Sequence, residues 1–464
     1  MNCKLFIVGA LFLALGFMAK AQERENTYTV SLKQAQEYAL ERNKQLQNVR
    51  NDVQIAAEQF KQARGQGLPQ INGSLDYMTN FNYEAMLNFG GGGESTPPDI
   101  NFGLLDPGDL EILKLLESMS APSATSIKMT DQSNAQIQVS QLIFGGQYWV
   151  GLETAKIAQI LARQNVKLTE LDVLENVANT YQLILATENI LKVIERNISN
   201  LEDIKQHTQN MYAAGMAEQT DVDQISISLS GLKNQQNAMQ RSISLNYNML
   251  RYQMGVHFDK EIVLTESLSD IMEALESSTG LTMEFNIAQN PSYQIIETQV
   301  EMQEKMIDME KWAYAPTLTG FYSYTEKIMT SGFDLSPNNA AGLNLSIPIF
   351  SSGVRKANLS RARIELDKAN RSKEMLSEQL QLQNNQLRYE LANAYENYNT
   401  QKSNVSVAER VLASMQNKYR QGLVSSLDLT QANTNYLLAE SNYLNSAIDL
   451  MQSNLKLEKL YNNL

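Results

Sequence analysis

One short pattern of side chains that can hydrogen-bond and carry charge occurs twice in the 464-residue chain. Tyr-x-x-Gly-x5-Asp places Tyr212, Gly215 and Asp221 in line, and the same spacing returns over Tyr419–Asp428. A glycine that ends a helix takes a positive φ. A carboxylate at the start of the next helix accepts backbone N–H groups and complements the helix dipole. Each pattern therefore predicts the turn of a helical hairpin, where the available chemistry is hydrogen bonding and electrostatics.

The sequence gives no support for catalysis or for a resident metal. His207 and His257 are the only histidines, far apart and without a neighbouring carboxylate or hydroxyl motif that marks an acid–base site. Zinc-protease, nucleophile-elbow and phosphate-loop patterns do not occur. Met302, Met306 and Met309 fall at helical spacing, which is typical of core packing rather than of soft-metal ligands. We expect no enzyme and no cofactor.

The elements that carry the two patterns are themselves duplicated. Tyr38 pairs with Phe285, and further positions follow at the same spacing, namely Leu40/Ile287, Asn43/Asn290, Gln47/Gln294, Pro69/Pro316, Gly73/Gly320 and Tyr77/Tyr324. Both copies run helix, short strand, strand, very long helix, glycine turn, long helix. Each copy spans roughly 200 residues, too long for a solenoid repeat, so we interpret the chain as a duplicated half-molecule.

The N-terminal segment and the charge indicate the compartment. Residues 1–21 combine a basic start, an apolar run and an Ala-x-Ala site, which predicts a secretory signal peptide that is removed. The only cysteine, Cys3, precedes the apolar run, so we expect no lipid anchor. Removal of Lys4 and Lys20 takes the formal charge from −13 to −15. Such an acidic chain argues against nucleic acid as a partner. No later stretch is long enough for a membrane-spanning helix.

Proline-free stretches rich in helix-forming residues predict four helices, at about 147–212, 220–254, 353–419 and 427–461. Each of the two long ones would measure about 100 Å. The return helices carry heptad seams, from Val222 to Leu250 and from Leu429 to Leu457. The last helix adds a second apolar stripe, from Leu437 to Leu455. Two stripes favour neighbours on two sides, as in a wall of helices, over an ordinary two-stranded coiled coil.

Four segments alternate apolar and polar residues with the period of a β-strand: 71–83, 135–143, 318–324 and 343–349. This pattern suits a transmembrane β-barrel and also a soluble sheet with one buried face. Duplication in an exported chain favours the membrane. Four strands cannot close a barrel around water, and lipid tolerates no open sheet edge. Three copies would supply twelve strands and a channel. We therefore expect an oligomeric conduit.

The turn patterns, the duplicated element order, and Ser31–Ala35 leading to Glu41–Asn43 resemble the TolC-type outer-membrane factor family over about residues 28–464. The resemblance implies a mainly α protein with a membrane β-barrel: duplicated long helical hairpins form an α-barrel, and four strands per chain contribute to a twelve-stranded trimeric barrel. It implies a first repeat at 22–255, an equatorial linker at 256–287 and a second repeat at 288–464.

The same resemblance implies the function of a homotrimeric outer-membrane channel-tunnel that extends into the periplasm. Its partners would be a periplasmic adaptor, an inner-membrane transporter and outer-membrane lipid, with no nucleic acid. The chain departs from the family pattern in three ways. About 84–132 forms an insertion, expected to be extracellular. A lipidated cysteine after the signal is missing. Leu423-Val424 stands where many relatives have an arginine.

By the resemblance, the hairpin turns lie at the periplasmic mouth of the tunnel. The expected gate residues are Asp428, Asp221, Tyr419 and Tyr212. The expected adaptor-docking residues are Gly215, Met216, Gly422, Leu423 and Val424. Three copies of Asp428 would form an acidic constriction, although Asp221 or Asp223 could line the narrowest ring instead. Tyr419 would hold adjacent tips together through a hydrogen bond to Asp221.

Two other classes of protein remain as alternatives: a periplasmic adaptor with one long hairpin, and a coiled-coil structural protein of the cell envelope. An adaptor would need a single hairpin inside a lipoyl-like domain, and a structural filament would need no alternating strands. The cargo stays open, because drugs, metal ions, siderophores and secreted proteins would all pass a wide polar bore.

Overall fold

The computed structural model describes residues 27–79, 81, 83–88, 106–108, 111–112, 114, 124–129, 131–277, 284–330 and 336–464, without the side chains of 83–88 and 124–129. The expected signal peptide and much of the 84–132 insertion lie outside these residues. The chain divides into two compact units. Unit 1 contains residues up to Glu58, Lys156–Glu304 and Arg363–Leu464, and unit 2 contains Gln59–Ala155 and Lys305–Ala362.

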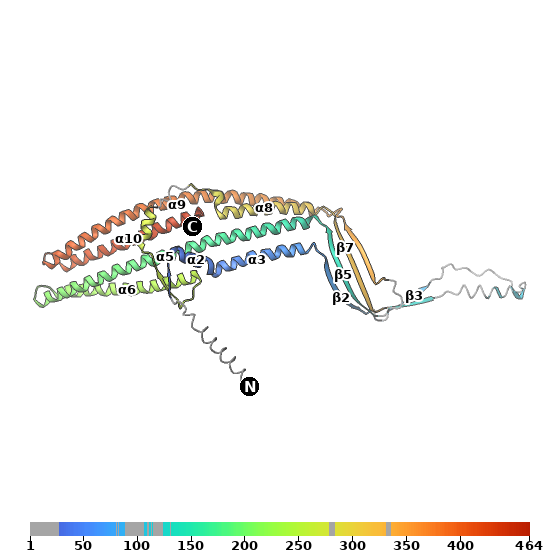
Figure 1. Cartoon of the computed structure of the whole chain (residues 1–464), viewed down its shortest axis with the longest axis horizontal. Helices are drawn as coiled ribbons and strands as arrows, with labels where there is room; N and C mark the ends of the chain where they lie inside the picture. Colours follow the sequence, from blue (N-terminus) through green and yellow to red (C-terminus); the bar gives the residue numbers. More distant parts are fainter. Residues whose placement is uncertain are drawn as a thin grey trace, which may run out of the picture. The chain divides into compact units, whose positions relative to one another are not determined.

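Two long helical hairpins follow from the proline-free stretches of the sequence (Figure 1). Helix α5 (Gly146–Ala213) returns as α6 (Gln219–Met254), and α9 (Val354–Arg420) returns as α10 (Ser426–Leu460). The long helices contain 68 and 67 residues, which corresponds to about 100 Å each. The four helices predicted from the sequence are confirmed to within one or two residues at each end.

Both apolar stripes of the last helix are buried. In α6 the seam residues Val222, Ile225, Leu229, Leu232 and Leu250 are buried, and in α10 so are Leu429, Ala432, Leu450 and Leu457. The second stripe of α10 is buried as well, at Leu444, Met451 and Leu455. Helix α10 therefore has neighbours on two sides, as its two stripes predicted.

Short elements of unit 1 surround the C-terminal ends of the return helices. Strand β1 (Thr27–Val30) pairs in parallel with β6 (Glu261–Leu264). Helices α2 (Leu32–Arg42) and α7 (Leu268–Ser277) complete the layer. The main core lies here and includes Val30, Leu46, Tyr181, Leu250, Met254 and Ile262. Buried Tyr181 donates its hydroxyl to the Val30 carbonyl at 3.2 Å, and burial raises the pKa of Tyr181 to about 12. The pairing of β1 with β6 was not predicted.

The two repeated asparagines make equivalent hydrogen bonds in the two repeats. Asn43 lies between α2 and α3 (Lys44–Gly65), and its side chain accepts from Leu46 N at 3.1 Å and donates to the Gln253 carbonyl at 2.8 Å. Asn290 lies between the 3-10 turn η3 (Ile287–Gln289) and α8 (Pro291–Trp312). It accepts from Ser292 N at 3.0 Å and donates to the Leu460 carbonyl at 3.0 Å. Each asparagine thus joins a helix start to the end of the return helix of its own repeat.

The four alternating segments form one antiparallel sheet in unit 2. Its order is β2 (Gln70–Met78), β5 (Gln132–Phe144), β7 (Thr317–Met329) and β8 (Asn339–Ser346). The register aligns the apolar sets: Leu75 lies opposite Ala135, Ile137 opposite Tyr324, and Leu318 opposite Leu345. Large members of this face are exposed, including Ile71, Leu75, Ile137, Tyr324, Leu343 and Leu345.

The insertion contributes a separate antiparallel ladder between β3 (Tyr83–Asn88) and β4 (Ala124–Met129). The sequence predicted an extracellular loop at about 84–132, with a short amphipathic helix from Leu110 to Met119 as an equal alternative to a plain loop. Most of that helix lies outside the described residues, and the β3–β4 pairing is an addition to this interpretation. Among the helices that the structure describes, none combines the length and the apolar character needed to cross a membrane.

Candidate functional site

The two hairpin turns share one backbone geometry. Gly215 and Gly422 take φ values of 73° and 72°, in the left-handed region that glycine favours. At the first turn, the Gly215 N–H donates to the Tyr212 carbonyl at 2.9 Å and the Met216 N–H to the Met211 carbonyl at 2.8 Å. The second turn repeats this arrangement, with Leu423 N donating to the Lys418 carbonyl at 2.9 Å. These bonds satisfy the last carbonyls of α5 and α9, and they confirm the predicted turns.

Both aspartates cap the return helices. Asp221 Oδ2 accepts the Glu218 N–H at 3.0 Å. Asp428 Oδ2 accepts the Ser425 N–H at 3.1 Å and the Ser425 hydroxyl at 2.7 Å, while Ser425 Oγ accepts the Asp428 N–H at 3.2 Å. The Ser425 hydroxyl and then its N–H lower the pKa of Asp428, because both stabilise the carboxylate. Asp428 is exposed and stays charged at neutral pH.

Two side-chain contacts join the hairpins of the two repeats near these turns. The Ser426 hydroxyl donates to Asp221 Oδ1. The Tyr419 hydroxyl and Thr208 Oγ1 lie 2.6 Å apart. Because Thr208 Oγ1 already donates to the Ile204 carbonyl at 2.8 Å, the Tyr419 hydroxyl is the donor in this pair. Tyr419 is 5% exposed.

These contacts correct one sequence-based expectation. Tyr419 was expected to bond to Asp221, but within the chain it bonds to Thr208 and Asp221 bonds to Ser426. Both aspartate and threonine offer an oxygen acceptor, and only the packing of α5 against α9 decides which one Tyr419 meets. A serine directly after the second turn was the available signal for the partner of Asp221.

The other predicted tip residues differ in exposure. Tyr212, Met216 and Leu423 are 47%, 72% and 68% exposed. Val424 instead packs against the small core of Leu412, Tyr419, Leu429 and Ala432. The turn surface is therefore apolar at Met216 and Leu423, while Val424 anchors the second turn by packing against this core.

A small polar pocket lies beside Tyr419. Its volume is about 170 Å³, and it is lined by Asn200, Asp203, Ile204, His207, Gln416, Tyr419 and Arg420. The His207 ring is 6.1 Å from the Tyr419 ring. His257, expected to lack an acidic neighbour, contacts Asp259 at 2.6 Å on the surface, which corrects that expectation. Within the described residues, no group of three or more His, Cys, Asp and Glu side chains is arranged to hold a metal ion.

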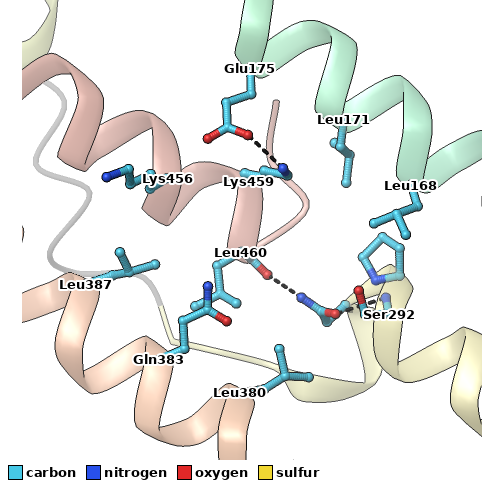
Figure 2. A pocket seen from close by; sticks show the side chains of 12 residues that line it. Leu168, Leu171, Glu175, Ser292, Leu380, Gln383, Leu387, Lys456, Lys459 and Leu460 are labelled. Carbon is cyan, nitrogen blue, oxygen red and sulfur yellow. Dashed lines mark hydrogen bonds and ion pairs between the residues drawn. The ribbon is translucent and has the colours of Figure 1, made fainter. Parts of the chain in front are cut away.

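A second pocket lies at the other end of the return helix α10. It has a volume of about 330 Å³ and is bordered by α5, α8, α9 and α10 (Figure 2). Leucines line one part of it, and Lys459 crosses to Asp172 and Glu175, each at 2.6 Å. Burial lowers the pKa of Lys459, but its hydrogen bonds to these two carboxylates outweigh burial and raise the pKa overall.

The duplicated hairpins, the four-stranded sheet and the capped turns agree with a family model described as outer membrane efflux protein, which matches residues 35–256 and 286–463. The chain belongs to the outer membrane efflux protein family. Membership in this family places the chain in the outer membrane, and the family consists of channel proteins rather than enzymes.

Known members of the family are distant in sequence. The cation efflux system protein CusC of Escherichia coli O157:H7 is 24% identical over 409 residues, which is 85% of this chain and 77% of CusC. The outer membrane protein TolC of Vibrio cholerae serotype O1 is 22% identical over 252 residues, which is 52% of this chain and 57% of TolC. The match thus spans little more than half the length of that TolC.

Solved structures share the fold. The outer membrane protein VceC of Vibrio cholerae has a TM-score of 0.67 at 16% identity, covering 93% of this chain and 96% of VceC. The fold class predicted from the sequence is confirmed. The main functional expectation, an outer-membrane efflux channel, is confirmed at the level of the family, and the alternatives of an adaptor or a structural coiled coil gain no support.

Proposed function

We propose that three copies of this chain form the outer-membrane duct of a tripartite export complex. The observation that carries this proposal is the sheet β2-β5-β7-β8, which exposes a registered apolar face and has β2 and β8 at its two edges. Both edges need strand partners in lipid, where unpaired backbone groups are costly. Further copies of the sheet supply such partners, and three copies give the twelve strands of a barrel with an open bore.

The proposed duct takes small solutes from the periplasmic side to the outside. Its 22–255 and 288–464 repeats line the tunnel, the 256–287 segment with β6 and α7 forms part of the equatorial layer, and the 84–132 insertion lies on the extracellular side. The description of the family includes efflux, and the name of one relative includes cation efflux. The net negative charge of the chain agrees with a preference for cationic cargo.

The proposed gate is at the hairpin turns. Asp428 is exposed and ionised, so three copies near one axis would concentrate negative potential, attract cations and repel anions. The Tyr419–Thr208 and Ser426–Asp221 contacts hold the second hairpin against the first. Tyr212 is the exposed counterpart of Tyr419, and it is available to a neighbouring copy.

Partners of the proposed duct meet it at these turns. Met216 and Leu423 present apolar side chains on the two turn surfaces, which the positive-φ glycines Gly215 and Gly422 shape. An adaptor that offers apolar helical tips would cover them, and the adaptor would connect the duct to an inner-membrane transporter.

Two measurements test the proposal. Mass determination in mild detergent should give a trimer of the mature chain, and planar-bilayer recordings should give cation-selective channels. A stable monomer or dimer that retains its β-sheet signal would contradict the ring, and a trimer that conducts no ions under any condition would contradict the duct.

A further inference from the structure

The two repeats each build a pocket at the end of the return helix, and the two pockets share four equivalent positions. The pocket of the second repeat is lined by Asn290, Pro291 and Ser292 and by Lys459 of α10. The pocket of the first repeat has a volume of about 220 Å³ and is lined by Asn43, Lys44 and Gln45 and by Tyr252 of α6. The spacing that relates Asn43 to Asn290 also relates the residues that follow them. The spacing between Tyr212 and Tyr419 relates Tyr252 to Lys459.

The second-repeat pocket has a wall that the first-repeat pocket lacks. That wall comes from α5 of the other repeat and consists of Leu168, Leu171 and Glu175 (Figure 2). The spacing of the long helices relates these three residues to Met375, Glu378 and Leu382 of α9. In the chain by itself Met375 and Leu382 are 69% and 68% exposed. Tyr252, on the opposite side of the missing wall, is 66% exposed.

Equivalent pairs of residues differ in polarity between the two repeats: a pair that is charged in one repeat is uncharged in the other. The ion pair of Lys459 with Glu175 in the second repeat corresponds to Tyr252 and Leu382, which are both apolar. Leu171 and Pro291, which line the second-repeat pocket, correspond to Glu378 and Lys44, which carry opposite charges. In each case both residues of a pair change together, so the two side chains of the first-repeat pair still suit each other. They do so even though Tyr252 lies far from Leu382, and Lys44 far from Glu378, in one chain.

We infer that the face of α9 formed by Met375, Glu378 and Leu382 closes the first-repeat pocket of a second copy of this chain, against Tyr252 and Lys44. This inference rests on the ring of copies proposed above and specifies its contact. The contact is heterologous, because two different surfaces meet, and such a contact forms a ring when the rotation between copies closes, as in the proposed trimer. In this arrangement Tyr252 and Leu382 meet between two chains, whereas the Lys459–Glu175 ion pair forms within one chain. This difference penalises mispairing, since Lys459 would then face Leu382 and leave a partly buried charge without a partner.

Cross-linking tests the contact directly, because the only cysteine of the sequence is Cys3 in the expected signal peptide. A long side-chain contact exceeds the reach of a disulfide, so a short bismaleimide is the suitable reagent. The Tyr252→Cys, Leu382→Cys double variant should give covalent dimers and trimers in place of monomer on a denaturing gel. The equivalent pair within one chain, Lys459→Cys with Glu175→Cys, should react within the monomer and add no higher band.

Mixed expression shows which surfaces meet. Tagged Tyr252→Cys chains co-expressed with untagged Leu382→Cys chains should give tagged–untagged dimers, whereas each single variant alone should give none. Dimers from one single variant alone would mean that the contact is two-fold symmetric, and this would overturn the inference. A trimer by mass in which the double variant does not cross-link between chains would overturn the inference while leaving the duct standing. A monomer by mass would overturn both.

A charge exchange provides a second test. Leu382→Glu alone and Tyr252→Lys alone should each lower the trimer fraction in mild detergent at least several-fold. The double variant copies the Lys459–Glu175 pair and should restore most of the trimer. Equal loss in the double variant, with helix content unchanged in circular dichroism, would contradict the contact.

Discussion

Replacing Tyr419 by phenylalanine removes one hydroxyl from the contact between the two hairpins and leaves the aromatic side chain packed in place. Tyr419 is 5% exposed and Thr208 is fully buried, so water has little access to replace the lost bond. Thr208 keeps its own bond to the Ile204 carbonyl, and its oxygen loses only the hydrogen bond that it accepts from Tyr419. The expected loss is therefore that of one net hydrogen bond, about 0.5–1.5 kcal/mol per chain.

In a trimer whose proposed gate opens by an outward movement of the second hairpin, the consequence is larger, since this movement breaks the bond in every copy. Three copies together lose about 1.5–4.5 kcal/mol, which corresponds to a shift in a closed–open balance of about 10-fold to about 10³-fold. We expect single Tyr419→Phe channels in planar bilayers to spend more time in the conducting state, with unchanged conductance of that state.

Tyr389→Phe is the matched control, because Tyr389 lies on the same helix α9, is 73% exposed and has no part in the proposed gate. It should leave gating close to that of the native chain. A double-mutant cycle with Thr208→Val isolates the pair. If Tyr419→Phe changes neither open time nor melting temperature, or if its effect is unchanged in the Thr208→Val background, the hydroxyl contact does not hold the hairpins.

Four further outcomes are expected. Asp428→Ala should reduce cation selectivity, measured as a smaller reversal potential in a salt gradient, whereas an unchanged potential would limit Asp428 to capping. Asn290→Ala removes two cap bonds and the bond to α10, and we expect a loss of about 2–3 kcal/mol in unfolding free energy by denaturant titration. Lys459→Met should cost about 1–3 kcal/mol. Because the folded-state pKa of Lys459 is raised, this contribution is complete below the unfolded pKa of about 10.4 and disappears only as pH rises through the folded value. Melting temperatures should therefore show a constant difference from about pH 6 to about pH 9. Deletion of 88–124 should leave the trimer mass intact in mild detergent, and loss of the trimer would assign the insertion a structural role.

Features set by local sequence were predictable. The long helices follow from proline-free runs, the turns from Gly215 and Gly422, and the caps from Asp221 and Asp428, because each depends on neighbours within a few residues. The alternation of apolar and polar residues predicted the strands of the sheet, and its period of two predicted which residues share the apolar face.

Features that depend on distant partners were not predictable. Strand β1 is four residues long and pairs with β6 more than 200 residues later, and neither segment alone has a distinctive pattern. The family resemblance assigned the partner of Tyr419 to Asp221, whereas helix packing brings Thr208 to the hydroxyl. The roles of Asn43 and Asn290 were visible only as a repeat until their bonds to Gln253 and Leu460 located them.

Those two asparagine bonds also set an order in which the chain can fold. The closing partners of the first repeat extend only to Glu266, since β1 pairs with β6, Asn43 bonds to the carbonyl of Gln253 and the Leu32 N–H donates to Glu266. The second repeat must wait for Leu460, because its bond from Asn290 and the Lys459 ion pair both lie at the end of α10. The first hairpin therefore provides a finished surface on which the second assembles. Shortening the chain by a few residues before Leu460 would stop folding at its last step, and a trimer would then be lost without loss of the first hairpin.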